Sequence, residues 1–584
     1  MSRAEKMPLA DLRLPIDGKR APVRSHRKTQ IATRQLARYF VARGWLHLIL
    51  LTGVGIFVFP LVWMAATSMK TDDELTNGRW LPQMPRFVGR SPYVLAAPAP
   101  VKPIGLSAEQ FATFLPILQQ TTRHAVDAAG PESPEHAAAA AAVLLNRMTV
   151  RIPATVWAGG DQATLRDTYA ALLTPEAVRE ALADRVARFE LRGLLFRMLD
   201  AHVTSICDPD TLASTWRIES GDAQLVALPE GGAYLRYAFA DAGAAPITLC
   251  YDFDLPADFS QLHRLMVSYK ADRTWHRIDA ELKVGGDRWI GQRPTYLAQA
   301  RPASILLQPP TFEDHTFKNK IWTPLKLVSS APLPSDAPPR ATLRLMLSPS
   351  STLEAIGAKM QFNYDRAFHY VPFWRYVANS LILVALCTAG TLFSSTFVAY
   401  AFARLRWPGR SIALVLLLST MMLPAQVTMI PSFMIWRELG WYNTLNPLWV
   451  PAWFGGAFFI FLMTQHMKTI PRELEEAARI DGLNAVQIWW YVIVPLVKPA
   501  AAAIAIMSAM AAWNEFMGPL IYLRDQAKFP LSLGLWGMRT DFTSGIDWTL
   551  IMAGNVLMTL PVIVLFFICQ RYFIQGMAMS GMKG

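Results

Sequence analysis

Residues 471–499 read PRELEEAARIDGLNAVQIWWYVIVPLVKP, and this stretch decides how the rest of the chain is interpreted. Pro471 is typical of the first turn of a short helix. Three glutamates follow near the positively polarised start of that helix, namely Glu473, Glu475 and Glu476. Gly482 then allows a turn that few other residues can form, and a second, mostly apolar helix follows. We therefore predict two short helices joined at a glycine, a shape suited to a groove in a soluble partner.

Apolar segments flank this stretch on both sides. A helix needs about 20 apolar residues to cross a membrane, and six segments reach that length without a central Lys or Arg. They are residues 45–69, 377–403, 411–436, 447–467, 495–523 and 549–574. We predict an all-α membrane protein with six transmembrane helices, of which helices 2 to 6 form a core in residues 371–584.

The placement of positive charge predicts the orientation of these spans. Basic residues crowd the amino-terminal tail, residues 1–44, and recur after the second span and between the fourth and fifth spans. Lys and Arg mark cytoplasmic loops, so both termini and residues 471–499 are expected in the cytoplasm. Residues 70–370 are then expected outside, in the periplasm of a bacterium with two membranes.

The net charge of +12 does not indicate a nucleic-acid partner. Much of it precedes the first span, where contact with anionic lipid headgroups explains it. Neither zinc-ligand spacing nor a basic recognition helix accompanies the charge. Hydrophobic residues make up 52% of the chain and charged residues 17%, and the low charged fraction also favours a membrane protein.

Residues 70–370 are typical of a soluble insertion and contain two different sequence patterns. From about 107 to 205 the sequence is helical, with Thr174 and Pro175 as the start of a helix over 177–199. From about 213 to 360 the apolar residues alternate, as at Leu265, Val267 and Tyr269, and glycine and proline separate the runs. We predict a soluble α+β insert that contains a β-sandwich.

The residues of the insert that could bind a sugar or act in catalysis have simpler structural explanations. Its four central tryptophans are more typical of core packing than of sugar stacking: Trp216, Trp275, Trp289 and Trp322. Asp252 and Asp254 are more typical of a strand surface than of a glycosidase. We predict neither an enzyme nor a metal site, and keep Cys207 and Cys250 as a candidate disulfide in an oxidising compartment.

The central stretch resembles a known family motif. The order Glu476, Ala477, Ala478, Gly482, Val492 and Pro495, with Asp481 before the glycine, resembles the EAA loop of type I ABC-importer permeases. That family usually has Ile and Leu where this chain has Val492 and Val494, a conservative difference. The resemblance implies that this loop docks on a separate ATPase subunit. Consistently, the chain lacks the GxxxxGK[ST] phosphate-binding loop.

Further segments resemble the carbohydrate-uptake branch of these permeases, and within it the shorter kind of maltose-transporter permease. They are Phe59, Pro60, 63–70, Asn379, Ser380, 513–516, 570–576, Lys583 and Gly584. The likeness covers roughly residues 40–85 and 363–584. It implies a second homologous permease, a periplasmic solute-binding protein, and ATP with Mg²⁺ used by the ATPase, while this chain itself binds no cofactor.

Polar residues within the predicted spans are functional candidates, because burying them in a membrane is costly. Gln426, Asn514 and Glu515 qualify, and gating or helix packing is as good an explanation for the last two as solute contact. The alternative for the whole chain is a membrane-anchored sensor or carbohydrate-binding protein without transport activity. The sequence leaves the solute and the role of the insert open.

Overall fold

A computed structural model describes most residues of the chain. They are residues 25–76, 80–103, 105–131, 133–159, 161–198, 203–229, 231–254, 262–298, 302–310, 322–330, 340–539 and 547–580. The chain forms two compact units, Met1–Trp63 and Met64–Gly584. Part of the predicted basic tail, residues 1–24, lies outside the described residues.

The first unit contains most of one long helix, α1 (Ser25–Ser68). Its part from Trp45 to Ser68 is long and apolar enough to cross a membrane, in agreement with the predicted first span at 45–69. In the part of the chain that the structure describes, four helices meet this criterion, or five when one bent pair is counted as a span. The prediction of six spans therefore stays a prediction.

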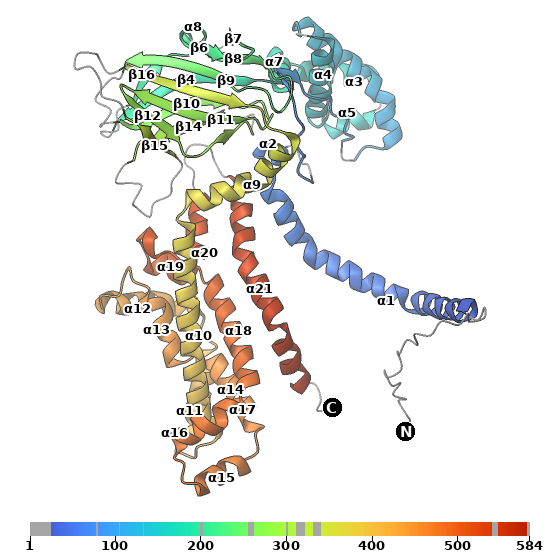
Figure 1. Cartoon of the computed structure of the whole chain (residues 1–584). Coiled ribbons are helices and arrows are strands. Elements are labelled where there is room, and N and C mark those ends of the chain that lie inside the picture. Colours follow the sequence, from blue (N-terminus) through green and yellow to red (C-terminus); the bar gives the residue numbers. More distant parts are fainter. Residues whose placement is uncertain are drawn as a thin grey trace, which may run out of the picture. The chain divides into compact units, whose positions relative to one another are not determined.

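The membrane core of the second unit consists of α10 and the helices that follow it. Their bounds are α10 Phe373–Ala403, α11 Arg410–Thr420, α12 Ala425–Glu438, α13 Asn446–Phe454, α14 Ala457–Lys468, α15 Glu473–Ile480, α16 Ala485–Ile488, α17 Val494–Leu496, α18 Lys498–Asn514, α19 Met517–Tyr522, α20 Leu531–Trp536 and α21 Trp548–Ser580. Helix α10 is the centre of this part, because it packs against α13, α14 and α18 (Figure 1). Buried small and hydroxyl residues of α10, such as Gly390 and Ser394, allow this close contact.

The predicted third span, 411–436, is wrong as a single helix. It is interrupted between α11 and α12, where residues 421–424 leave the helix. Pro424 explains the break, because proline disfavours helical geometry in the residue before it. The predicted fifth span also differs, since 495–523 is divided among α17, α18 and α19, and the chain bends by 81° just before Lys498.

Helices form the first part of the soluble insert. Their bounds are α2 Asp72–Thr76, α3 Ala108–Ala128, α4 Pro134–Thr149, α5 Ala154–Gly159, α6 Gln162–Leu172 and α7 Pro175–Arg185. Residues of α3, α4, α6 and α7 share one buried apolar cluster that includes Leu118, Leu144 and Tyr169. The predicted start of α7 is confirmed, because the Thr174 side chain accepts a hydrogen bond from the Ala177 N–H and Pro175 follows it.

The predicted helical boundary at 205 is wrong, because α7 ends at Arg185 and strands begin at Val186. Leu191, Leu194, Leu195 and Met198 are spaced like one face of a helix. In the structure they belong to a strand, Phe189–Met198, whose pairing with its neighbour shifts register beside Gly193. Such a β-bulge interrupts the period of two, so the strand imitates a helical pattern.

In the described part of the insert, fourteen strands form one sheet. Their bounds are β1 Arg90–Ser91, β4 Phe189–Met198, β5 Val203–Cys207, β6 Arg217–Ser220, β7 Ala223–Ala227, β8 Ala233–Ala238, β9 Ile247–Asp254, β10 Leu262–Lys270, β11 Arg277–Val284, β12 Asp287–Gly291, β13 Thr295–Tyr296, β14 Pro302–Gln308, β15 Thr323–Ser329 and β16 Arg340–Ser348. A separate pair joins β2 (Tyr93–Val94) to β3 (Val186–Ala187). The remaining helices of this region are α8 (Leu212–Thr215) and α9 (Thr352–Tyr370), so the predicted strand region, 213–360, ends too late.

The strands follow the order β1-β8-β4-β10-β14-β15-β12-β11-β16-β9-β6. All of their pairings are antiparallel except β14 with β15. The predicted alternation is confirmed, because Leu265, Val267 and Tyr269 are buried in β10 while their neighbours are partly exposed. Residues from both ends of the sheet form one buried cluster, which is the core of the strand region.

Other predictions about the insert are also confirmed. Trp216, Trp275 and Trp322 are buried, and Trp289 packs against the core cluster, as core packing requires. Asp252 and Asp254 lie on the exposed side of β9 and pair with arginines of neighbouring strands, as surface residues do.

The candidate disulfide is wrong, because Cys207 and Cys250 are both free thiols. Cys207 belongs to the core cluster, with its Sγ 3.3 Å from Thr215 Oγ1. Cys250 points to the other face of its strand, since its neighbours Leu249 and Tyr251 face the core, and its Sγ donates to Glu219 Oε2 at 2.8 Å.

We predict that both thiols stay reduced in the folded protein. Alkylation under denaturing conditions without prior reduction should modify both cysteines, and a reductant should leave the unfolding temperature of the insert unchanged. A peptide that links Cys207 to Cys250 in mass spectrometry would contradict this prediction.

Candidate functional site

The predicted helix–glycine–helix unit is present in residues 473–496. Helix α15 ends at Ile480, and Gly482 follows with a backbone φ of +86°, which glycine adopts without strain. Asn484 then caps α16: its side chain accepts from the Gln487 N–H, while the Gln487 side chain accepts from the Asn484 N–H, both at 2.9 Å. The turn and the second helix therefore each have a defined local cause.

A buried ion pair holds α15 against the membrane core. Arg404, at the end of α10, places its Nε 3.0 Å from Glu475 Oε1, and both side chains are almost completely buried. The same guanidinium donates to the Ile470 carbonyl at 2.7 Å and to the Met467 carbonyl. Arg404 thus joins the end of α10, the end of α14 and the start of α15. Sequence reasoning missed this role, because Arg404 read only as one of several cytoplasmic charges.

An apolar seat completes the attachment of the loop. Ala478, Ile488, Trp489 and Ile493 are buried from the loop side. They pack in one cluster against Val497, just before α18, and against residues of α10, α14 and α18, namely Ala399, Tyr400, Ala403, Met463, Met467 and Ile504. Val492, a motif residue, is half-buried against this cluster. The loop is therefore a folded part of the core, not a loose connection.

The opposite side of the loop faces outward. Glu476, Ala477, Asp481, Gly482 and Pro495 are all exposed. Apolar side chains accompany them, and Ile480 is 87% and Leu474 44% exposed. Exposed apolar groups beside charged ones are typical of a surface that contacts another protein. Of the motif residues, Ala478 alone turns fully inward.

A wider helical turn connects the loop to α18. Residues Trp489–Ile493 form a π-helical segment, and α17 follows. Pro495 contributes to this irregularity, since it has no N–H to donate to the preceding turn. Such π segments are frequent at functional sites.

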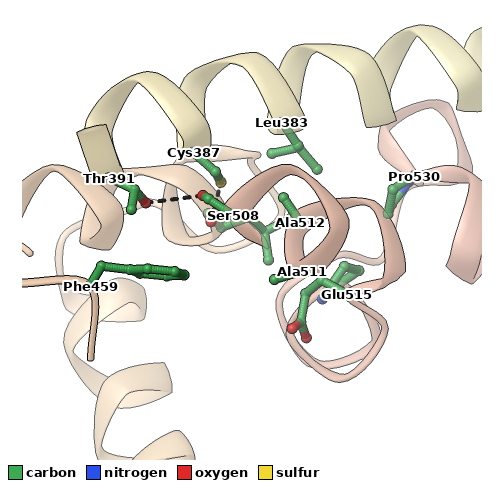
Figure 2. Close-up of a pocket in the computed structure, with 11 residues that line it drawn as sticks. Leu383, Cys387, Thr391, Phe459, Ser508, Ala511, Ala512, Glu515 and Pro530 are labelled. Atoms are coloured by element: carbon green, nitrogen blue, oxygen red, sulfur yellow. Dashed lines mark hydrogen bonds between the residues drawn. The ribbon is translucent and has the colours of Figure 1, made fainter. Parts of the chain in front are cut away.

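A second candidate site is a cavity of about 220 Å³ inside the membrane core (Figure 2). Its lining comes from several elements: Leu383, Cys387, Thr391, Leu448, Phe459, Ser508, Ala511, Ala512, Glu515, Pro519 and Pro530. Ser508 Oγ donates to Thr391 Oγ1 at 3.2 Å, which joins α18 to α10 across the cavity wall. Cys387 Sγ donates to the Leu448 carbonyl at 3.4 Å. The wall is mostly apolar with a few hydroxyl groups.

The three predicted polar candidates have different positions. Glu515 lines the cavity just before α19, and its Oε1 accepts from the N–H of Gly518, in the first turn of that helix, at 2.9 Å. Asn514 is exposed and donates to the Met510 carbonyl at 2.9 Å. Gln426 is exposed on α12 and does not line the cavity. Thr391 and Ser508 were missed, because single hydroxyl residues in apolar helices carry little sequence signal.

Comparisons with known proteins agree with this geometry. Residues 390–579 match the family model described as "Binding-protein-dependent transport system inner membrane component". That range contains the loop at 471–499 and most of the cavity lining.

Several curated relatives share the same part of the chain. The arabinooligosaccharides transport system permease protein AraQ of Halalkalibacterium halodurans is 33% identical, over 36% of this chain and 75% of the relative. AraQ of Bacillus subtilis is 32% identical, over 41% of this chain and 87% of the relative. The lactose transport system permease protein LacG of Rhizobium radiobacter is 34% identical, over 35% of this chain and 72% of the relative.

Among solved structures, a bacterial ABC transporter involved in the import of the acidic polysaccharide alginate has a chain 31% identical to this one. The match covers 36% of this chain and 79% of that chain, with a TM-score of 0.33. Identities above 30% over more than two thirds of the curated relatives establish the family. The chain therefore belongs to the inner membrane components of binding-protein-dependent transport systems, the permease subunits of ABC importers.

Proposed function

We propose that this chain forms half of the pathway of an ATP-driven importer for a sugar or a sugar-like solute. The observation that carries the proposal is the loop at 473–496, whose inner side is fixed by Arg404 and the apolar seat while its outer side is exposed. A rigidly seated helix with an exposed face transmits force, because movement of a partner on that face must move the attached spans.

The partner on the exposed face is a separate ATPase subunit, which binds and uses ATP with Mg²⁺. Glu476, Ala477 and Asp481 offer charge and a small side chain to a groove in that partner. A second homologous permease completes the pathway, and a periplasmic solute-binding protein delivers the solute.

The solute class follows from relatives and agrees with the cavity. Relatives of this chain are named for the transport of arabinooligosaccharides, galactooligosaccharides, lactose and sn-glycerol-3-phosphate. The hydroxyl groups of Thr391 and Ser508 and the carboxylate of Glu515 lie along the otherwise apolar cavity wall. A few polar groups in an otherwise apolar pocket fix the orientation of a bound small molecule.

We also propose the topology that the charges predict. The chain crosses the bacterial inner membrane six times, with α11 and α12 together as the third crossing and both termini in the cytoplasm. Residues 70–370 then lie in the periplasm, and their strands form a sandwich around the buried cluster. Accessibility of single cysteines placed at Glu438 and Glu476 tests the topology, because a membrane-impermeant reagent should reach only the first from outside.

Uptake in membrane vesicles tests the function itself. The chain is to be expressed with a candidate ATPase, second permease and binding protein, and a panel of radiolabelled mono- and oligosaccharides supplied. We expect uptake of at least one sugar that depends on ATP, together with co-purification of the ATPase. A chain that binds sugar but neither transports it nor retains an ATPase would instead be a sensor or binding protein.

Substitutions in the loop should separate transport from insertion. We expect Glu476→Lys and Gly482→Val to reduce uptake and solute-stimulated ATP hydrolysis at least tenfold, with normal amounts of chain in the membrane. The valine is strained at positive φ, at a cost of about 1–2 kcal/mol. Glu438→Lys and Gly440→Val are matched controls, because Glu438 is an exposed glutamate and Gly440 an uncrowded glycine with φ of +70°. Full uptake by both loop variants would contradict the role of the loop.

A further inference from the structure

Helix α9 is the contact between the soluble insert and the membrane core. It begins directly after the last strand and ends just before α10. Three polar side chains on it, Lys359, Asn363 and Arg366, follow one another at spacings of four and three residues. Side chains at these spacings share one face of a helix, so the three lie side by side along α9.

Two of these side chains hold the segment that follows α1. Lys359 forms a buried ion pair with Glu74 and donates to the Gln83 carbonyl at 2.5 Å. Asn363 Nδ2 donates to the carbonyls of Ser68 and Lys70, at 2.9 and 2.8 Å. Breaking the Lys359–Glu74 pair would leave both charges buried, which is strongly unfavourable. This half of the contact is therefore fixed.

The insert is attached to the same place by the loop between β10 and β11. Arg273 in this loop places its Nε 3.3 Å from Asp73 Oδ2 in α2. Trp275 packs edge-on against Phe362 of α9, with ring centroids 5.5 Å apart. Arg273 and Trp275 both have positive φ, near +60°, which is uncommon outside glycine and shows how tightly the loop turns.

The third side chain reaches the last membrane helix. Arg366 Nη2 donates to Asp547 Oδ2 at 2.5 Å, immediately before α21. Burial raises the pKa of Asp547, but Arg366 and hydrogen bonds from Leu550 and Thr549 outweigh it and hold that pKa below its usual value. Asp547 is thus a carboxylate at the start of α21, where the helix dipole also favours negative charge.

Both partners of this outer pair have other favourable contacts. Asp547 Oδ1 accepts from the Leu550 N–H and from Thr549 Oγ1, each at 2.9 Å, so its charge stays solvated by the helix start. Arg366 is 36% exposed, lies 5.3 Å from the centre of the Phe362 ring and donates to Asn363 Oδ1 at 3.3 Å. Water reaches Arg366 when the pair separates, whereas Lys359 and Glu74 are only 4% and 9% exposed, so separating that pair would leave both charges out of water.

We propose that α9 is a conformational relay with one fixed and one releasable contact. Lys359, Asn363 and Arg273 keep the insert, α9 and the segment after α1 together. The Arg366–Asp547 pair, with the longer contacts of Thr549 Oγ1 to Asn363 Oδ1 at 3.4 Å and to Asp72 Oδ1 at 3.3 Å, opens and closes as α21 moves in the transport cycle. The insert therefore follows, and biases, the position of the last membrane helix. This inference rests on the proposed transport function and assigns the insert a regulatory role in it.

Reversible crosslinking tests the relay in the assembled transporter. Arg366→Cys with Asp547→Cys is to be bridged by a cleavable bis-thiol reagent, and uptake measured before bridging, after bridging and after cleavage. The matched control is Arg273→Cys with Asp73→Cys, because that pair has similar exposure but lies in the fixed half. The chain with its natural cysteines receives the same reagent.

We expect bridging of 366 to 547 to reduce uptake at least tenfold and cleavage to restore it, whereas bridging of 273 to 73 leaves uptake within twofold. Unchanged uptake with 366 bridged to 547, or equal loss in the control pair, would overturn the relay. Absence of uptake by the untreated natural chain would instead count against the proposed function.

A second measurement leaves the ion pair intact. Spin labels at the exposed positions Leu353 in α9 and Trp548 in α21 report their separation in the resting and the ATP-bound transporter. We expect the distance distribution to shift between the two states. One unchanged distribution in both states would show a static contact and overturn the proposal, even if the paired cysteines alone disturb transport.

Discussion

Replacement of Arg404 by methionine should abolish transport while leaving the soluble insert folded. The substitution leaves Glu475 buried without its cation and deprives the Met467 and Ile470 carbonyls of a donor. Loss of one partner of a buried ion pair typically costs about 3–5 kcal/mol. That is enough to unseat α15 from the core in most molecules, and an unseated loop no longer transmits movement to the spans.

Two further variants make this expectation specific. Arg404→Met combined with Glu475→Met should recover part of the uptake, because apolar replacement of both partners removes the stranded charge. Arg406→Met is the matched control, since Arg406 is an exposed arginine two residues away, and surface substitutions usually change stability by less than about 0.5 kcal/mol. The measurements are uptake in vesicles, ATPase retention and protease cleavage between residues 471 and 499. Normal uptake by Arg404→Met would show that the ion pair does not seat the loop.

The Arg404–Glu475 ion pair could not be predicted from the sequence. The motif drew attention to Glu476, yet the buried glutamate is its neighbour Glu475 and the exposed one is Glu476. Both belong to the same run of acidic residues, and which one turns inward depends on the rotation of α15 against α10. The partner, Arg404, is some 70 residues earlier in the chain, so neither local pattern nor spacing predicts the contact.

Local signals predicted local structure well. Thr174, Pro175 and Gly482 act within a few residues of themselves, and the structure has the cap, the first turn and the positive-φ turn that they predict. The alternation in β10 likewise reports a face of one strand. Such features depend on backbone geometry and burial alone, which the sequence carries directly.

Non-local packing explains the failures. The strand at Phe189–Met198 was predicted as helix because a bulge beside Gly193 interrupts its alternating pattern. That bulge depends on pairing with β10, which the local sequence does not reveal. Cys207 and Cys250 read as a candidate pair because the sequence does not say that they face opposite sides of the sheet. The cavity combines five helices, and its residues Thr391 and Ser508 meet only through tertiary contact.

We expect that Gly390 in α10 cannot be replaced even by alanine without loss of transport. A Cβ built there lies 2.4 Å from Trp453 Cδ1 and 2.6 Å from Trp453 Nε1, closer than real carbon contacts. Gly390→Ala must therefore push the indole away, and with it α13, which carries Leu448 into the cavity wall. Overpacking of this kind typically costs about 1–3 kcal/mol. We expect at least a tenfold loss of uptake and a lower unfolding temperature in detergent.

Gly357→Ala is the matched control, because Gly357 is also within a helix, α9, and a Cβ there meets nothing within 4 Å. Alanine is favoured over glycine in helices by about 1 kcal/mol, so this variant should be neutral or slightly more stable. A smaller residue at the clashing position supplies the complementary test: Trp453→Phe should restore part of the uptake of Gly390→Ala. Equal behaviour of the two alanine variants would mean that the contact of α10 with α13 does not shape the cavity.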